Sequence, residues 1–317
     1  MSECHQLIAN QKSNVDEEGG GAYGKVISCK IETESNNTVR IAVKIVNLSD
    51  SILLELEDHR TIINNELIAL DNINRLDSIW LPLYYGCIYD NEEEIVYIFM
   101  EHLDAIITEG LKKDVYDRME PKDRQVKALQ VMLQTARGVE GLHSLGLAHN
   151  DIRNFNIMLD ERSGVTKLID FGRVCMADQD RYDKAVKPEK RKNGYIKNVN
   201  PNKLAPPTAC RLSNDIKDLK FIFRLIMEIV LDIPLSSSDI SSMDRDNEQF
   251  EESILSLFEE DQKNTITDII PKLEQMLKGR ADSELLDVET LSNDYRLKNL
   301  DKFKLNVFSA ETRIQIR

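Results

Sequence analysis

Two short polar motifs near the middle of the chain constrain its fold and chemistry more than any other feature. The first is His-Asn-Asp-Ile-Arg-Asn-Phe-Asn at residues 149–156, and the second is Ile-Asp-Phe-Gly at residues 169–172. Between them, two short β-like runs flank the turn-forming sequence at 160–164. The pattern presents a carboxylate, a cation two residues later, an amide five residues later, and a second carboxylate after the strand pair.

These side chains, in this order, favour metal-assisted phosphoryl transfer. Asp151 can accept a hydroxyl proton and orient a nucleophile. Asn156 and Asp170 supply hard oxygen ligands for Mg²⁺, which prefers few protein ligands together with phosphates and water. Arg153 can neutralise charge on the transferring group. Each residue alone is more often a turn former or a helix cap, but the complete set favours a catalytic site.

A glycine-rich run, Gly-Gly-Gly-Ala-Tyr-Gly-Lys-Val, occupies residues 19–26 and fits the pattern G-x-G-x-x-G-x-V. Its defining positions are Gly19, Gly21, Gly24 and Val26. Glycines permit backbone conformations denied to other residues and let amide groups approach phosphate oxygens closely. A flexible turn explains the glycines alone equally well. A β-like run follows rather than a helix, which argues against a Rossmann crossover.

A lysine on an apolar β-like run, Lys44, follows the glycines by about twenty residues. An ammonium group inside a cleft would place a point charge on nucleotide phosphates, although a strand lysine alone more often faces solvent. The next helical segment offers three glutamates to hold it, Glu55, Glu57 and Glu66. Glu66 is the favoured partner, because leucines follow it on the predicted inward face.

On these residues the chain resembles the eukaryotic-type protein kinase superfamily, from about residue 19 to about residue 280. The family pattern is a glycine-rich loop, A-x-K, a helix glutamate, H-R-D-x-x-x-x-N, D-F-G and A-P-E. The resemblance implies a bilobal α+β fold, with a small β-rich N-lobe and a larger, mainly helical C-lobe. It implies ATP and Mg²⁺ as cofactors. The divisions it suggests are a flexible N-terminus at 1–17, an N-lobe at 18–103, a C-lobe at 104–290 and a C-terminal tail of unknown role at 291–317.

The resemblance also implies roles for individual residues. Lys44 would hold the α- and β-phosphates and pair with Glu66, and Asp151 would be the catalytic base. Asn156 and Asp170 would bind the metal. The residues implied around the nucleotide, including the gatekeeper Met100 and the hinge 101–103, are Gly19, Gly21, Gly24, Val26, Ala42, Met100, Glu101, Leu103 and Met158. Leu70, His149 and Phe171 would form the regulatory spine, and Asp215 would anchor the catalytic loop.

The chain departs from the family pattern at a position tied to regulation. Asn150 replaces the arginine that in the family reads a phosphate on the activation loop through charge-assisted hydrogen bonds. Between Asp170 and Pro207 there is no Ser or Thr, and the hydroxyl side chains are those of Tyr182 and Tyr195. Both observations predict activity that does not require activation-loop phosphorylation.

Two further departures concern the substrate side. The segment from residue 184 to residue 203 is basic, which suggests an acidic or phosphorylated protein substrate or simply a solvated loop. Pro-Pro-Thr at 206–208 lacks the A-P-E glutamate, so Arg280 is expected to be exposed or held by Glu274 or Asp282. Arg153 stands where many Ser/Thr kinases have lysine, so the acceptor stays open, with Ser/Thr favoured over Tyr.

Composition narrows the partners and the location. The net charge of −14 argues against nucleic-acid or anionic-membrane binding, and the most apolar stretch, 221–235, carries charges and is too short to span a bilayer. The five cysteines are scattered without a CxxC pair, which is unlike a disulfide framework or a zinc site and fits a reducing compartment. A cytoplasmic location is expected, with signal-independent export into a host left open; the oligomeric state cannot be read.

Two alternatives share much of this evidence. A pseudokinase scaffold would keep the fold and bind nucleotide for contacts, and nucleotide-dependent stabilisation with Mg²⁺ followed by an ATPase assay would separate it. A small-molecule kinase of the aminoglycoside or choline type shares the phosphate chemistry, and the sequence His-Asn-Asp leans slightly that way. The glycine loop with Val26 and the activation segment that ends in prolines argue against a small-molecule kinase.

The spacing of apolar residues predicts a small sheet with one helix before about residue 104 and mainly helix after it. The expected strands are 25–32, 38–46, 95–100, 156–159 and 165–169. The expected helices are 52–76, a stripe at 126–136 that is ended by the region of Gly138, Gly141 and Gly146, 221–231 and 269–286.

Overall fold

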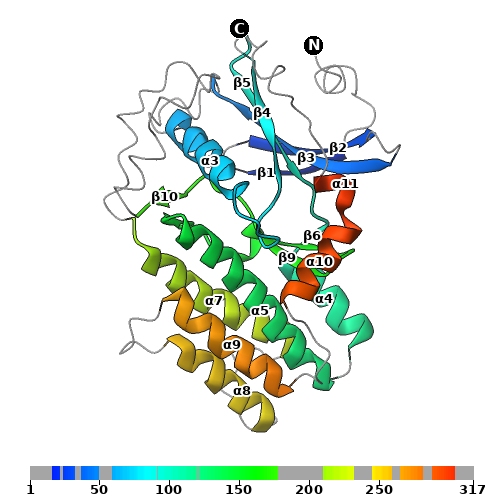
Figure 1. Ribbon diagram of the computed structural model, residues 1–317, viewed down its shortest axis with the longest axis vertical. Helices are drawn as coiled ribbons and strands as arrows, with labels where there is room; N and C mark the ends of the chain where they lie inside the picture. The colour runs from blue at the N-terminus through cyan, green and yellow to red at the C-terminus, as the bar shows by residue number, and fades with distance from the viewer. Residues whose placement is uncertain are drawn as a thin grey trace.

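The computed structural model of the protein describes residues 16–21, 24–32, 37–49, 59–90, 92–119, 121–177, 210–231, 245–258, 265–280 and 288–303. These residues form a β-rich N-lobe above a larger helical C-lobe (Figure 1). The predicted α+β, bilobal arrangement is therefore confirmed. In the described part of the chain, every helix is too short or too polar to cross a lipid bilayer.

The N-lobe is built on a five-stranded antiparallel sheet with the strand order β1-β2-β3-β5-β4. The strands are β1 (Asp16–Gly21), β2 (Gly24–Glu32), β3 (Thr38–Asn47), β4 (Tyr84–Asp90) and β5 (Ile95–Glu101). Helix α3 (His59–Ile73) lies beside the sheet (Figure 1). Strand β1 begins two residues before the expected start of the lobe. The expected helix at 52–76 has its first residues outside the described chain.

The pleat of β3 explains how one strand serves two purposes. Successive side chains of a strand point to opposite faces, so Ile41 and Val43 enter an apolar cluster on one side of the sheet. Ala42, Lys44 and Val46 therefore share the other face, where Val46 joins the main core together with residues of α3. The strand thus has both faces buried near its middle, and a lysine is held on an otherwise apolar surface.

The C-lobe is organised around a long helix, α5 (Pro121–Ser144), which packs against α7 (Leu212–Leu231) and α9 (Ile266–Arg280) (Figure 1). The helix ends at Ser144, within the expected region from Gly138 to Gly146, and Gly146 follows with a φ of 74°. A Cβ atom at Gly138 would lie 3.1 Å from the Trp80 carbonyl oxygen, and one at Gly141 would lie 3.1 Å from Leu81 Cδ1. These glycines allow close packing inside the helix instead of ending it.

The remaining C-lobe elements include the β8–β9 hairpin, which lies between the two polar motifs. They are α4 (Ile107–Arg118), α8 (Arg245–Leu255), η5 (Ser256–Phe258), β6 (Ala105–Ile106), β7 (Leu147–Ala148), η1 (Asn154–Asn156), β8 (Ile157–Asp160), β9 (Val165–Leu168) and β10 (Cys175–Met176). Strand β8 pairs with both β6 and β9, and β7 pairs with β10. Strand β6 follows the hinge, residues 101–103. The hinge therefore connects strand β5 of the N-lobe to the three-stranded β6-β8-β9 sheet of the C-lobe.

The C-terminal part of the described chain forms two more helices, α10 (Val288–Lys298) and α11 (Leu300–Phe303). They lie along the side of the molecule next to β6 and close to the N-lobe sheet (Figure 1). Helix α10 begins before the expected end of the C-lobe at residue 290. The helix expected at 269–286 ends at Arg280, and residues 281–287 lie outside the described chain.

Candidate active site

Lys44 lies at the centre of a buried ion-pair network. Its Nζ atom is 2.8 Å from Glu66 Oε1, 2.9 Å from Glu66 Oε2 and 3.3 Å from Asp170 Oδ1. The side chains of Lys44 and Glu66 are 11% and 2% exposed. Burial lowers the pKa of Lys44, but the two carboxylates more than offset this effect, and the net pKa lies above its usual value. The ammonium group is therefore held charged between α3 and the residues that follow β9.

Asp170 has a left-handed backbone conformation with φ of 63°. Such a conformation is uncommon for residues other than glycine and tends to occur at functional sites. Burial raises the pKa of Asp170, but Lys44 and the Gly172 backbone N–H lower it by more than burial raises it. The net pKa lies below its usual value. Asp170 is therefore ionised at neutral pH and can act as an oxygen ligand for a cation.

Asp151 and Asn156 lie in direct contact on the loop between β7 and β8. The Asn156 Nδ2 group donates hydrogen bonds to the Asp151 backbone oxygen at 2.8 Å and to Asp151 Oδ2 at 2.9 Å. Arg153 Nε is 3.4 Å from Asp151 Oδ2 and keeps a largely exposed side chain. The Ile169 N–H donates to the Asn156 carbonyl oxygen at 2.8 Å. This bond connects the loop to the residue that precedes Asp170.

The fully buried side chain of Asp215, near the start of α7, fixes this loop from below. It accepts hydrogen bonds from the backbone N–H groups of His149 and Asn150, both at 2.8 Å, and contacts His143 Nε2 at 2.9 Å. Asn150 has a φ of 59°, which asparagine tolerates better than most residues. The loop that carries Asp151 is therefore held by a buried carboxylate.

His149 connects the catalytic loop to the segment after β9. Its Nε2–H donates to the Ile169 carbonyl oxygen at 3.0 Å, and its ring packs edge-on against Phe171 with the ring centres 5.5 Å apart. Burial lowers the pKa of His149, so its ring is neutral at neutral pH. Leu70 is also fully buried, in the main core that contains Phe171.

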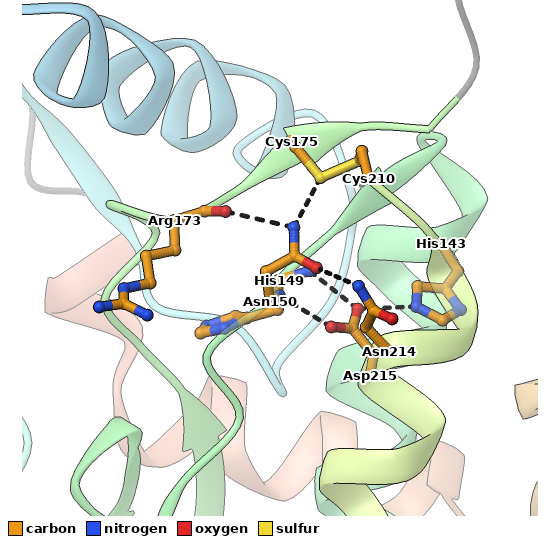
Figure 2. The surroundings of a disulfide bond; sticks show 8 residues. All are labelled: His143, His149, Asn150, Arg173, Cys175, Cys210, Asn214 and Asp215. Carbon is orange, nitrogen blue, oxygen red and sulfur yellow. Dashed lines mark hydrogen bonds and ion pairs between the residues drawn. A yellow bond between two sulfur atoms is a disulfide. The ribbon is translucent and has the colours of Figure 1, made fainter. Parts of the chain in front are cut away.

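Asn150 takes part in a contact that the sequence does not predict. Its Nδ2 group donates to Cys175 Sγ at 2.6 Å and to the Arg173 carbonyl oxygen at 3.4 Å. Its Oδ1 atom accepts from Asn214 Nδ2 at 3.2 Å. Figure 2 shows Asn150 between these groups, with its amide nitrogen directed at the sulfur atoms.

Cys175 forms a disulfide with Cys210, 35 residues later in the chain (Figure 2). The expectation of a chain without disulfides is therefore wrong. The two Cα atoms are 5.9 Å apart, because β10 runs beside the segment that leads into α7. No sequence motif links the two cysteines. The bridge joins the two described ends of the activation segment, whose residues 178–209 lie outside the described chain.

The residues expected around the nucleotide lie on the N-lobe sheet, the hinge and β8. Gly24 has φ of 151°, and a Cβ atom there would lie 2.5 Å from the Ile45 carbonyl oxygen, so this position requires glycine. In the sheet register, Gly19 lies opposite Val26, Gly21 opposite Gly24, and Ala42 opposite Met100. Leu103 is buried in the hinge, and Met158 is half-buried on β8.

The Glu101 side chain is fully buried, and both of its carboxylate oxygens are bound by protein groups. Its Oε2 atom accepts a hydrogen bond from the Leu83 N–H at 3.1 Å and pairs with Lys167 at 2.8 Å. Its Oε1 atom contacts Tyr295 and Lys302 from the C-terminal helices. A direct contribution of Glu101 to nucleotide binding therefore falls to its backbone. No sequence motif marks Lys167, Tyr295 or Lys302, although a lysine inside the apolar strand β9 is a usable signal.

The oxygen atoms present fit Mg²⁺ held largely by phosphates. Within the described ranges, no group of three or more His, Cys, Asp and Glu side chains is arranged to hold a metal ion. Asp170 offers one carboxylate, and Asn156 donates through its Nδ2 group to Asp151, so its Oδ1 atom is the one left to act as a ligand. Two protein ligands completed by phosphate and water suit Mg²⁺.

Arg280 is exposed, which confirms one of the two alternatives expected for it, exposure or a carboxylate partner. Its Nε group donates to Gln125 Oε1 at 3.0 Å, and its guanidinium group lies 5.0 Å from the centre of the Phe250 ring. The expected partner Glu274 contacts Arg137 instead. The predictions on the basic segment 184–203, Tyr182, Tyr195, residues 206–208 and Asp282 concern residues outside the described chain.

Comparison with known proteins agrees with this geometry. The family model for the protein kinase domain matches residues 13–190, more than half of the 317-residue chain. The chain is 32% identical over 168 residues to serine/threonine-protein kinase sid1 of Schizosaccharomyces pombe, which is 53% of this chain and 32% of that protein.

Two proteins of Saccharomyces cerevisiae are similar to the same degree. MAP kinase kinase kinase SSK2 is 31% identical over 154 residues, 49% of this chain and 9% of that protein. MAP kinase kinase MKK1/SSP32 is 29% identical over 161 residues, 49% of this chain and 28% of that protein. The chain thus spans about a third or less of the length of these three relatives. The matched kinase domain, the bilobal fold and the connected set of polar residues together place this chain in the eukaryotic-type protein kinase superfamily.

Proposed function

We propose that the protein transfers the γ-phosphoryl group of ATP to a hydroxyl group of a protein substrate, with Ser or Thr favoured over Tyr. The observation that carries the proposal is the network around Lys44. Lys44 binds Glu66 and Asp170. The Ile169 N–H, next to Asp170, donates to the Asn156 carbonyl oxygen on the loop where Asn156 contacts Asp151. The similarity to sid1, a serine/threonine-protein kinase, supports a Ser/Thr acceptor.

Each residue in the network has a distinct role in the proposed reaction. Lys44, held charged by Glu66, places its ammonium group on the α- and β-phosphates. Asp151 orients the acceptor hydroxyl and takes its proton. Asp170 and Asn156 would hold Mg²⁺, which would neutralise charge on the phosphates. Arg153, exposed beside Asp151, adds positive charge near the transferring group.

The glycine loop and the hinge position the nucleotide in this proposal. Gly19, Gly21 and Gly24 let backbone N–H groups approach the phosphates. The adenine lies between Val26 and Ala42 on one side and Met158 on the other. The Glu101 and Leu103 backbones face its edge, next to Met100. Correct placement of the phosphates relative to Asp151 is worth several orders of magnitude in rate.

Activity without activation-loop phosphorylation is part of the proposal. In the described structure, Asn150 occupies the arginine position and is bonded to Cys175 and Arg173. The Cys175–Cys210 bridge ties the two ends of the activation segment together. A covalent link at this place supplies the anchoring that a phosphate supplies elsewhere in the family.

Proposals on the substrate and the location rest on the charge of the segment 184–203 and on the chemistry of Cys175 and Cys210. The basic segment 184–203 suits an acidic or already phosphorylated protein substrate. We propose a cytoplasmic location, where the bridge between Cys175 and Cys210 would form only transiently. The redox state of the two cysteines in cells tests this proposal, because disulfides persist mainly in oxidising compartments. A bridge that is fully oxidised in cells at rest would contradict a cytoplasmic location.

Radiolabelled ATP transfer to a peptide array tests the proposed activity and its acceptor. The wild type should label Ser- or Thr-containing peptides, and Asp151→Ala should reduce labelling by about 10²–10⁴-fold. Asp123→Ala, which removes an exposed carboxylate from the first turn of α5, is the control and should match the wild type. Undiminished labelling by Asp151→Ala would show a contaminant or a misplaced site. Nucleotide binding without any labelling would favour a pseudokinase.

A further inference from the structure

Helices α10 and α11 contact both lobes and the hinge between them. On the N-lobe, Asp301 accepts a hydrogen bond from Asn37 Nδ2 at 2.6 Å, and Arg296 pairs with Asp77. On the C-lobe, Lys302 lies 3.7 Å from Asp160. In Figure 1 the two helices lie along the side of the molecule where the lobes meet. We call residues 288–303 the strap.

Tyr295 is the most deeply inserted residue of the strap. It is fully buried in an apolar cluster with Ile79, Trp80 and Val165. Lys167 Nζ lies 4.4 Å above the centre of its ring, which favours the lysine charge through a cation–π contact. The Tyr295 hydroxyl group donates to Glu101 Oε1. The strap is therefore docked through a specific side chain and not only through a surface contact.

The Glu101 carboxylate divides its contacts between the kinase core and the strap. The core holds Oε2 through the Leu83 N–H and Lys167. The strap holds Oε1 through the Tyr295 hydroxyl group and Lys302, whose Nζ lies 3.4 Å away. Burial raises the pKa of Glu101, but the two lysines more than offset it, and the net pKa lies below its usual value. A buried carboxylate is tolerated only with such partners.

The backbone of Glu101 connects this buried cluster to the cleft. Its N–H donates to the Leu83 carbonyl oxygen at 2.8 Å, while its side chain accepts from the Leu83 N–H. Both ends of Glu101 are thus fixed on the loop before β4. A shift of its carboxylate would move the hinge backbone that faces the nucleotide.

We propose that the strap positions the hinge for adenine, with Tyr295 and Lys302 as positioning residues for nucleotide binding. The inference rests on the proposed function, because it assigns the hinge backbone to the nucleotide. Loss of either side chain leaves Glu101 Oε1 underbonded in a buried setting, and the hinge relaxes to satisfy it. The effect is on the affinity for nucleotide and not on the chemical step, since both residues bond to Glu101 in the hinge.

The test compares Tyr295→Phe and Lys302→Met with the wild type. Tyr295→Phe keeps the ring and removes the hydroxyl group, and Lys302→Met keeps the length and removes the charge. Each should weaken the Kd for a fluorescent ADP analogue and raise KM for ATP by about fivefold or more, with kcat changed less than about twofold. Lys302→Arg, which keeps the charge, should restore much of the affinity.

Lys298→Met is the matched control. It removes a lysine from α10, the helix that carries Tyr295, where Lys298 is half-exposed and pairs with Asp294 at 2.7 Å, and it should leave Kd unchanged. Variants that melt earlier but bind nucleotide as tightly as the wild type would show a purely structural strap and overturn the inference. Nucleotide binding that responds as expected in a protein that transfers no phosphate would refute only the proposed function. A wild type that binds no nucleotide would contradict both.

Discussion

At the scale of single residues, the site depends on placing one cation between two carboxylates. Lys44 is held by Glu66 and Asp170, and all three side chains are largely removed from water. Charges in such surroundings are stabilised only as a set, because each would be costly to bury alone. The same arrangement keeps the lysine charged for the phosphates. Stability and function therefore share these residues, and a double substitution can separate them.

Lys44→Met should reduce both activity and stability. It removes the charge from the phosphates, and it leaves Glu66 buried without its partner, which costs about 3–5 kcal/mol of unfolding free energy. Lys44→Met combined with Glu66→Leu should regain most of the stability, because replacing a buried ion pair with apolar groups is often neutral. The double variant should still lack phosphoryl transfer. Denaturant unfolding and a transfer assay on all three proteins check this.

An outcome in which Lys44→Met unfolds like the wild type would mean that the pair is not buried in solution. A double variant that recovers transfer would remove Lys44 from the proposed chemistry.

The ion pair of Lys44 was predictable from the sequence, because a lysine on an apolar strand needs a carboxylate. Glu66 could be chosen over Glu55 and Glu57 only by the spacing of the leucines that follow it.

At the scale of elements, the bridge between Cys175 and Cys210 joins β10 to the segment before α7. Asn150 contacts Cys175, so the catalytic loop and the bridge form one local structure (Figure 2). In the family pattern an arginine at this position binds a phosphate on the activation loop. A kinase creates that contact by adding the phosphate, and a phosphatase removes it. A disulfide at the same place responds to the redox state instead.

Reduction of the bridge should lower the transfer rate more than the affinity for nucleotide. The double substitution Cys175→Ser and Cys210→Ser removes the link that closes the activation segment, and it should cost about 2–4 kcal/mol of unfolding free energy. Transfer to a peptide should fall by about tenfold or more, because the substrate-side segment loses its anchor, while Kd for ADP changes little. Steady-state kinetics with and without dithiothreitol measure both quantities.

Cys87→Ser is the control, since Cys87 on β4 is not disulfide-bonded, and this variant should respond to reductant as the wild type does. Equal transfer rates for oxidised and reduced wild type would show that the bridge does not organise the activation segment. Treatment with a phosphatase should leave the oxidised protein fully active.

The sequence predicts elements well where periodicity is strong and poorly where packing decides. The strands β2, β3 and β5 begin and end within two residues of expectation, because alternation of apolar residues marks them. Helix α5 continues through Gly138 and Gly141, because these glycines meet Trp80 and Leu81 from distant parts of the chain. Helix α7 begins at Leu212, nine residues before the apolar run that was visible. The disulfide had no sequence motif at all.

At the scale of the whole molecule, the candidate site lies between two lobes that supply different parts. The N-lobe contributes Lys44 and Glu66, and the C-lobe contributes Asp151, Asn156 and Asp170. The motifs alone predicted this set, because each motif keeps its own spacing in the sequence. The strap could not be predicted. Tyr295 has no local pattern, and its partner Glu101 is 194 residues away.

The central claim is that these residues from both lobes converge on one nucleotide and its Mg²⁺. Calorimetric titration with a non-hydrolysable ATP analogue, with and without Mg²⁺, measures this convergence directly. The wild type should bind about tenfold or more tightly with Mg²⁺, because the ion joins the phosphates to Asp170 and Asn156. Asp170→Asn should lose most of that gain and keep the metal-free affinity. Affinity that does not depend on Mg²⁺ in the wild type, or a gain that Asp170→Asn retains, would contradict the account.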